Sequence, residues 1–239
     1  MNLANVGVEV LKYNDTKMNE KLKYAKKIME EGWKAREALE FEKAEKLLNE
    51  ALKIFEEEGD HFNLIEATDH LAYSKKLKGL VLINEGLNLS IEALKTADER
   101  GMERALPLRA IMSLANAFGN FEVALKYCEE ALPLFDKSMP KADILSHKAT
   151  FLLRTGHIRE AGRVIDEALK LCEKNWEKER EPHRSIWKSK ALLTKGLILY
   201  NRKKLKEARE YGEEAKKLAQ KKDLKTRLIE INLFLDLFA

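Results

Sequence analysis

The sequence predicts an all-α protein, and three observations support that prediction. Leu, Lys, Glu and Ala, which are good helix formers, dominate its 239 residues. Gly (11) and Pro (4) are scarce, which leaves few positions for tight turns. An amphipathic pattern of 15 residues also occurs five times along the chain. Recurrence of one helical pattern at intervals of a few tens of residues is typical of stacked helical units.

The repeated pattern is an apolar residue, a small residue three positions later, and a Glu-Ala pair whose Ala lies seven positions after the small residue. It occupies residues 41–55, 83–97, 121–135, 158–172 and 205–219. Its small residues are Ala44, Gly86, Ala124, Ala161 and Ala208, followed by Ala51, Ala93, Ala131, Ala168 and Ala215. Seven residues are nearly two helical turns, so both small residues lie on one stripe of one helix. We expect these stripes to be contact points at which another helix approaches closely.

A second amphipathic helix precedes each pattern. Its small residue stands twelve positions before the first small residue of the pattern: Gly32, Ser74, Ala149 and Gly196, with Met112 as the exception. Short breaks such as FGN (118–120) and RTGH (154–157) separate the two helices. Glycine at these places fits a helix end followed by a tight reversal. The sequence therefore predicts about five helix-turn-helix units.

These units resemble the tetratricopeptide repeat (TPR) family over roughly residues 20–223. In the fourth unit the family pattern falls on Leu145, Lys148-Ala149, Leu152, Ala161, Ile165 and Ala168. The resemblance implies a right-handed α-solenoid superhelix of about five repeats, whose first helices line a concave groove. Repeats of the family are 34 residues long. Here the first small residues of successive units are 42, 38, 37 and 47 residues apart. The helices, or the links between units, must therefore be longer than in the family.

We expect three segments within a single domain: an N-terminal extension (1–19), the repeat domain (20–223) and a C-terminal capping helix (224–239). The chain end LIEINLFLDLF (228–238) is apolar on more than one helical face. The surplus indicates either a self-association patch or a chain that continues beyond this point. We favour a symmetric homodimer through Phe234 and Leu237, because exposed apolar patches usually mark interfaces.

Composition excludes several classes of protein. With 44 basic and 40 acidic residues, the charge is too balanced for bulk attraction to nucleic acid or membranes. The sequence shows no signal peptide and no apolar run long enough to span a membrane. Cys128 and Cys172 lie on the apolar faces of their predicted helices. We therefore expect buried, reduced thiols and a cytoplasmic protein. The single glutamine, Gln220, beside abundant Lys and Glu indicates either a hyperthermophilic source or biased codon usage.

No pattern of catalytic residues is visible. The five histidines form no zinc-binding pair, and the sequence has no glycine-rich phosphate loop or nucleophile motif. Glu66 and His70, four apart, could ligate a metal, but a surface pair is the favoured interpretation because metal sites need further ligands. We therefore expect a protein that is not an enzyme and that uses no cofactor or metal.

The resemblance also implies which residues line the groove. The candidates are Trp33, Arg36, Lys75, Lys78, Arg109, Asn116, His147, Arg154 and Tyr200. Lys190 and Asp143 occupy the same face of their predicted first helices, so the resemblance implies that they also face the groove. Trp33 is either a ligand-anchoring aromatic or a residue covered by the N-terminal segment.

Because basic residues prevail among the groove candidates, we expect a scaffold that binds an extended, acidic segment of a partner protein. Two alternatives remain: a helical-repeat nucleic-acid-binding protein, and a sensor module of a transcription system.

Overall fold

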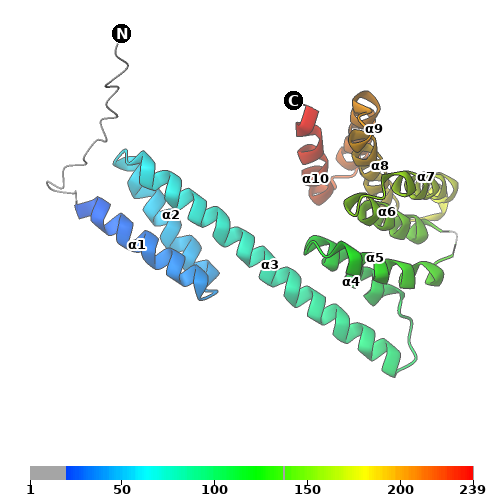
Figure 1. Cartoon of the computed structure of the whole chain (residues 1–239), viewed down its shortest axis with the longest axis horizontal. Coiled ribbons are helices and arrows are strands. Elements are labelled where there is room, and N and C mark those ends of the chain that lie inside the picture. Colours follow the sequence, from blue (N-terminus) through cyan, green and yellow to red (C-terminus); the bar gives the residue numbers. More distant parts are fainter. Residues whose placement is uncertain (1–19, 137, 239) are drawn as a thin grey trace, which may run out of the picture. The chain divides into compact units, whose positions relative to one another are not determined.

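A computed structural model describes residues 20–136 and 138–238, and helices account for most of this part of the chain (Figure 1). The ten α-helices of the described residues are α1 (Glu20–Glu37), α2 (Phe41–Glu57), α3 (His61–Glu99), α4 (Ala105–Ala117), α5 (Phe121–Ala131), α6 (Met139–Arg154), α7 (Ile158–Asn175), α8 (His183–Asn201), α9 (Leu205–Lys221) and α10 (Lys225–Leu235). In this part of the chain, no helix combines the length and the apolar character needed to cross a membrane. The proposed N-terminal extension, 1–19, lies outside the described residues.

The described residues contain four antiparallel helical pairs: α1–α2, α4–α5, α6–α7 and α8–α9. In each pair a turn of three residues joins the helices, and its middle residue has a positive φ. These residues are Leu39 (62°), Gly119 (87°), Gly156 (87°) and Lys203 (62°). One left-handed residue after a helix reverses the chain, and glycine adopts that conformation most easily.

The expected second pair is instead one continuous helix, α3, of 39 residues. Alignment of the repeats places Val81 at the position of the four left-handed turn residues. A β-branched side chain strongly disfavours a positive φ, so the chain continues as a helix. Gly79, two residues earlier, lies within α3 and provides no turn. The valine at this turn position explains why four hairpins form where the sequence predicts about five.

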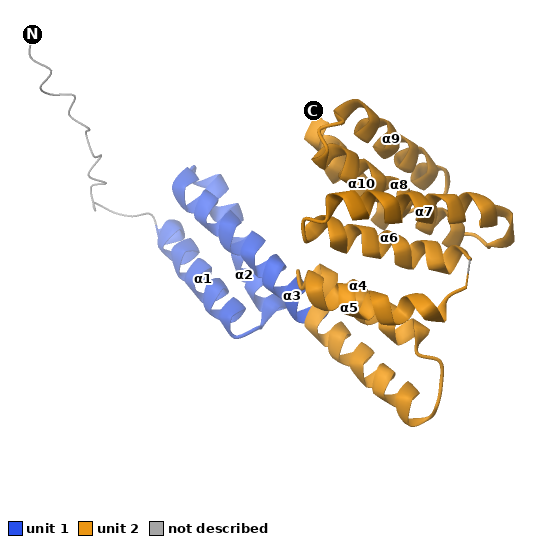
Figure 2. Cartoon of the chain, turned by 45° about the vertical axis from the view of Figure 1, so that its right-hand side comes forward, with its two compact units in different colours: residues 1–82 blue, residues 83–239 orange. Residues whose placement is uncertain are grey.

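The chain divides into two compact units within α3, between Leu82 and Ile83, whereas the sequence predicts a single domain (Figure 2). In unit 1, α1, α2 and the first half of α3 pack around Leu48, Ala51 and Phe55. In unit 2 the pairs α4–α5, α6–α7 and α8–α9 stack in chain order, and α10 packs on α8 and α9. Each pair thus covers the apolar face of the next, as in a helical-repeat array.

In the four helical pairs, the small-residue stripes form helix contacts as expected. Eight of the ten are fully buried: Ala44, Ala51, Ala124, Ala131, Ala161, Ala168, Ala208 and Ala215. Cys128 and Cys172 are also buried, and burial raises the pKa of both thiols to about 12. They pack as small apolar side chains and are not thiolates at neutral pH.

The C-terminal helix α10 caps the last pair. The ring of Phe234 lies over two glycines: a Cβ added at Gly196 would meet Phe234 Cε1 at 3.0 Å, and one added at Gly212 would meet it at 2.9 Å. Phe234, one of the two residues expected to mediate self-association, is therefore buried within its own chain. Leu237, the other residue of that expectation, is 53% exposed.

Candidate functional site

A groove of about 650 Å³ runs over the first helices of the pairs in unit 2. Its walls come from α4, α6, α8 and α10, which are neighbours in the stack. The first helices of these three pairs therefore contribute to its lining. The charged lining residues are Arg109, Asp143, Arg154, Lys190, Arg227 and Glu230, and His147 lies among them.

Asp143 is the centre of a buried ion-pair network at the base of the groove. Arg109 Nε donates a hydrogen bond of 2.8 Å to Asp143 Oδ2, and Arg109 Nη2 lies 2.8 Å from the same oxygen. Lys190 Nζ donates to Asp143 Oδ1 at 3.2 Å. The three residues come from α4, α6 and α8, so the network ties three successive repeats together. It also fixes the two cations in position, which lowers the entropic cost of binding an anion.

Burial and neighbouring charge shift the pKa values of the network. Burial alone would raise the pKa of the Asp143 carboxyl, but the charges of Lys190 and Arg109 outweigh it and hold the pKa well below its usual range. Burial lowers the pKa of His147, which contacts Lys190, to about 3. Burial also lowers the pKa of Lys190 to about 8. At neutral pH the network therefore contains a charged Asp143, a neutral His147 and a mostly charged Lys190.

Polar and aromatic groups continue the lining on both sides of the network. The Thr150 and Thr194 hydroxyls lie 3.3 Å apart, and Asn116 presents an amide on α4. The Arg109 guanidinium lies 5.7 Å from the centre of the buried Trp187 ring, a cation–π contact that holds the arginine against α8. Hydroxyls and amides at successive repeats suit the hydrogen-bonding groups of an extended backbone.

The groove carries a surplus of positive charge. Four basic residues (Arg109, Arg154, Lys190 and Arg227) and two acidic ones (Asp143 and Glu230) line it, which leaves +2. Arg154 is exposed and makes no ion pair within residues 20–136 and 138–238. Arg227 contacts Glu230, yet among the described atoms its buried Nε has no hydrogen-bond partner. Arg154 therefore keeps its donors available to an incoming anion.

Four of the nine candidate groove residues line this groove: Arg109, Asn116, His147 and Arg154. Trp33, Arg36, Lys75 and Lys78 belong to unit 1.

In unit 1 the candidate cations are engaged by carboxylates of their own chain. Lys75 pairs with Glu45 at 3.2 Å, and Lys78 pairs with Glu42 at 2.8 Å. Arg36 pairs with Glu37 at 2.7 Å and stacks on Tyr73. These ion pairs neutralise the positive charge that the sequence assigns to this part of the groove.

Tyr200 has a structural role in the cap. Its ring packs edge-on against Phe234 and Phe238, with centroids 6.4 and 5.5 Å away, and it is not among the groove-lining residues. Conversely, Arg227 and Glu230 line the groove from α10, and sequence reasoning missed both. The repeat pattern ends before α10, so it does not predict which residues of that helix face the groove.

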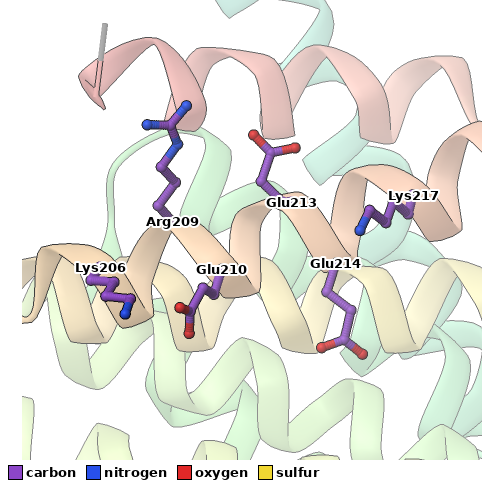
Figure 3. A pocket seen from close by; sticks show the side chains of 6 residues that line it. All are labelled: Lys206, Arg209, Glu210, Glu213, Glu214 and Lys217. Atoms are coloured by element: carbon purple, nitrogen blue, oxygen red, sulfur yellow. The ribbon is translucent and has the colours of Figure 1, made fainter.

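A second depression, of about 480 Å³, lies over α9 and has no features of a binding site. Figure 3 shows its lining residues, all of which come from α9: Lys206, Arg209, Glu210, Glu213, Glu214 and Lys217. Three basic and three acidic side chains cancel in charge. Such alternation is typical of a solvated helix face.

No family model and no curated protein matches the chain. Among solved structures it is similar to BtubC (BKLC) from P. vanneervenii, at 16% identity over 84% of this chain and 90% of that one, with a TM-score of 0.48. It is also similar to the TPR-like repeats of a putative kinesin light chain from Podosopora anserina, at 14% identity. The match covers 87% of this chain and 100% of that one, with a TM-score of 0.44. A third similar structure is NprR in complex with its cognate peptide NprX, at 18% identity. The match covers 92% of this chain and 62% of that one, with a TM-score of 0.47.

Proposed function

We propose that this helical-repeat protein is an interaction scaffold whose unit 2 groove binds an extended, acidic segment of a partner protein. The observation that supports this most strongly is the buried Asp143 network. It holds Arg109 and Lys190 at the base of a groove that carries a surplus of two positive charges. Asp143 engages Nε and Nη2 of Arg109, so Nη1 points away from that contact. A ligand carboxylate would complete the coordination of these cations.

The arrangement favours a peptide because its polar groups are spread over four helices. A compact anion would contact one or two of the cations, whereas an extended chain can reach Arg154, the central network and Arg227 in turn. Acidic side chains at intervals would pair with the cations, and Asn116, Thr150 and Thr194 would serve the backbone. Unit 1 is not included in the proposal, because its candidate cations are already paired.

The test is a charge reversal at Arg154, which supports no other described side chain. The probe is a fluorescently labelled peptide of alternating Glu and Ser, measured by anisotropy at low salt. We expect Arg154→Glu to weaken binding by about tenfold or more and to reduce its salt dependence.

The matched control is Arg163→Glu, the same change at an exposed arginine on α7. It alters the net charge equally and should change the affinity by less than about twofold. Equal weakening by both variants would mean that only overall charge attracts the peptide. Absence of binding to the wild-type chain would also contradict the proposal.

A further inference from the structure

The wall of the unit 2 groove formed by α10 and the short turn after it changes from charged to apolar along the chain. Its groove-lining residues are three or four positions apart, so they share one face of the helix. They are Arg227 and Glu230, followed by Leu233, Phe234 and Leu237. Phe234 is buried, but Leu233 is 66% exposed and Leu237 is 53% exposed. Two leucines at the end of the chain therefore present apolar surface to the groove.

Helix α8, which contacts α10, changes in the same direction. Along α8 the groove is lined by Lys190 and then by Leu193, Thr194 and Leu197. Burial lowers the pKa of Lys190 and the nearby charge of Arg227 lowers it further, so the charged parts of the two helices lie close together. The ring of Phe234 lies over Gly196, which brings the leucines of the two helices together as well. We call Leu197, Leu233 and Leu237 the leucine patch.

Cations lie on two sides of the leucine patch. Along α8, Lys190 precedes Leu197 by seven residues, a distance of about 10 Å. Across the groove, the Thr150 hydroxyl on α6 lies 3.3 Å from that of Thr194 on α8. Arg154 follows Thr150 by one turn of α6, so it lies level with Leu197. The groove thus combines apolar surface and positive charge within the reach of a few residues of an extended ligand.

We infer that the acidic segment bound by the groove carries a bulky apolar side chain, which packs on the leucine patch while its acidic neighbours pair with the cations. The inference rests on the proposed function and narrows the class of ligand. An extended chain advances about 3.3 Å per residue, so about 10 Å between Lys190 and Leu197 corresponds to three residues. The ligand should therefore have an acidic residue three positions from the apolar one.

Charge favours such a segment over the other ways of covering the leucine patch. A ligand with acidic residues alone leaves the leucines in water, and an apolar ligand leaves the cations unpaired. A second copy of this chain seated on the patch by twofold symmetry would bring two grooves of equal positive charge face to face. A segment that is both acidic and apolar matches both features of the lining.

The test compares three labelled peptides by fluorescence anisotropy at low salt. They are the peptide of alternating Glu and Ser, the same peptide with its central Ser replaced by Leu, and the same peptide with Gln there. In each, Glu residues stand one and three positions from the central residue. Leu and Gln are similar in length, so the comparison isolates apolar surface. We expect the Leu peptide to bind at least about tenfold more tightly than the other two, since a buried leucine supplies about that factor.

Two variants locate the apolar contact through the ratio of the affinities for the Leu and Gln peptides. Leu233→Gln removes part of the leucine patch and should reduce the ratio to about twofold or less. Ile229→Gln is the matched control, because Ile229 lies on the same helix and is 63% exposed but is not among the groove-lining residues. It should keep the ratio of the wild-type chain. Each ratio is measured on one protein, so a general loss of binding cancels, and helical circular dichroism checks the fold.

The outcomes separate this inference from the proposed function. Equal affinities of the wild-type chain for all three peptides would overturn the inference alone, whereas absence of binding to any of them would overturn both. A ratio that survives Leu233→Gln, or is lost in Ile229→Gln, would place the apolar contact outside the groove and overturn the inference. A wild-type dimer in light scattering that Leu233→Gln converts to a monomer would mean that a second copy covers the patch, and would overturn it too.

Discussion

Lys190 is a cation whose charge depends on pH near neutrality. Its pKa is about 8 because burial disfavours the ammonium form, and Asp143 only partly compensates. A ligand carboxylate interacts with the protonated form. The affinity for an acidic peptide should therefore be nearly constant between about pH 6 and pH 7, where the peptide carboxylates and Lys190 are both charged, and fall as the pH rises through 8.

This gives a prediction for a single residue. Between pH 7 and pH 9, the Kd of the wild-type chain for the Glu-Ser peptide should rise by up to about tenfold, since most of the charge on Lys190 is lost over this range. Lys190→Arg keeps its charge at all these pH values, so its Kd should stay nearly constant. Helical circular dichroism checks that the variant is folded. Equal pH dependence in both proteins would remove Lys190 from the binding site.

Among the helices, α10 attaches to the last pair through Phe234 together with Ile231, Leu228 and Leu235. Phe234 fills the space above Gly196 and Gly212, where any larger residue would collide with its ring. It also packs edge-on against Phe238 at 5.3 Å and against Tyr200. The ring thus contributes to the attachment of α10, the helix that supplies Arg227 and Glu230 to the groove.

We expect Phe234→Ala to lower the free energy of unfolding by about 3–5 kcal/mol, the usual cost of removing a buried aromatic ring. Leu237→Ala, at an exposed position of the same segment, should cost less than about 1 kcal/mol. Urea unfolding followed by circular dichroism measures both. Similar small losses in the two variants would show that α10 does not cap the last pair through Phe234.

The helical pairs could be predicted from sequence because their signals are local and repeated. Alanines at a spacing of seven and glycines at the turns recur often enough to fix the frame of the repeat. In α3 the corresponding position is Val81 within a continuous helix, whereas leucine and lysine adopt a positive φ at that position in two of the pairs. Residue type alone therefore did not show which turn would fail to form.

For the whole molecule, the repeat frame correctly placed Arg109, Asp143, His147 and Lys190 on neighbouring first helices. It could not show that Lys75 and Lys78 are neutralised by carboxylates on α2, because such pairing depends on the contact between two helices. It also could not place Arg227, whose helix follows the last repeat. The division of the chain within α3 follows from the unbroken helix and was likewise not visible in the repeat pattern.

Methyl NMR with the Glu-Ser peptide tests whether the unit 2 groove is the binding surface. Ile186, Leu193 and Leu197 line the groove and serve as probes there. Leu47 and Leu52 in unit 1 and Ile165 in the core of unit 2 are the reference methyls. We predict that the groove methyls shift on titration and that the reference methyls do not. Shifts confined to unit 1, or spread evenly over both units, would contradict the claim.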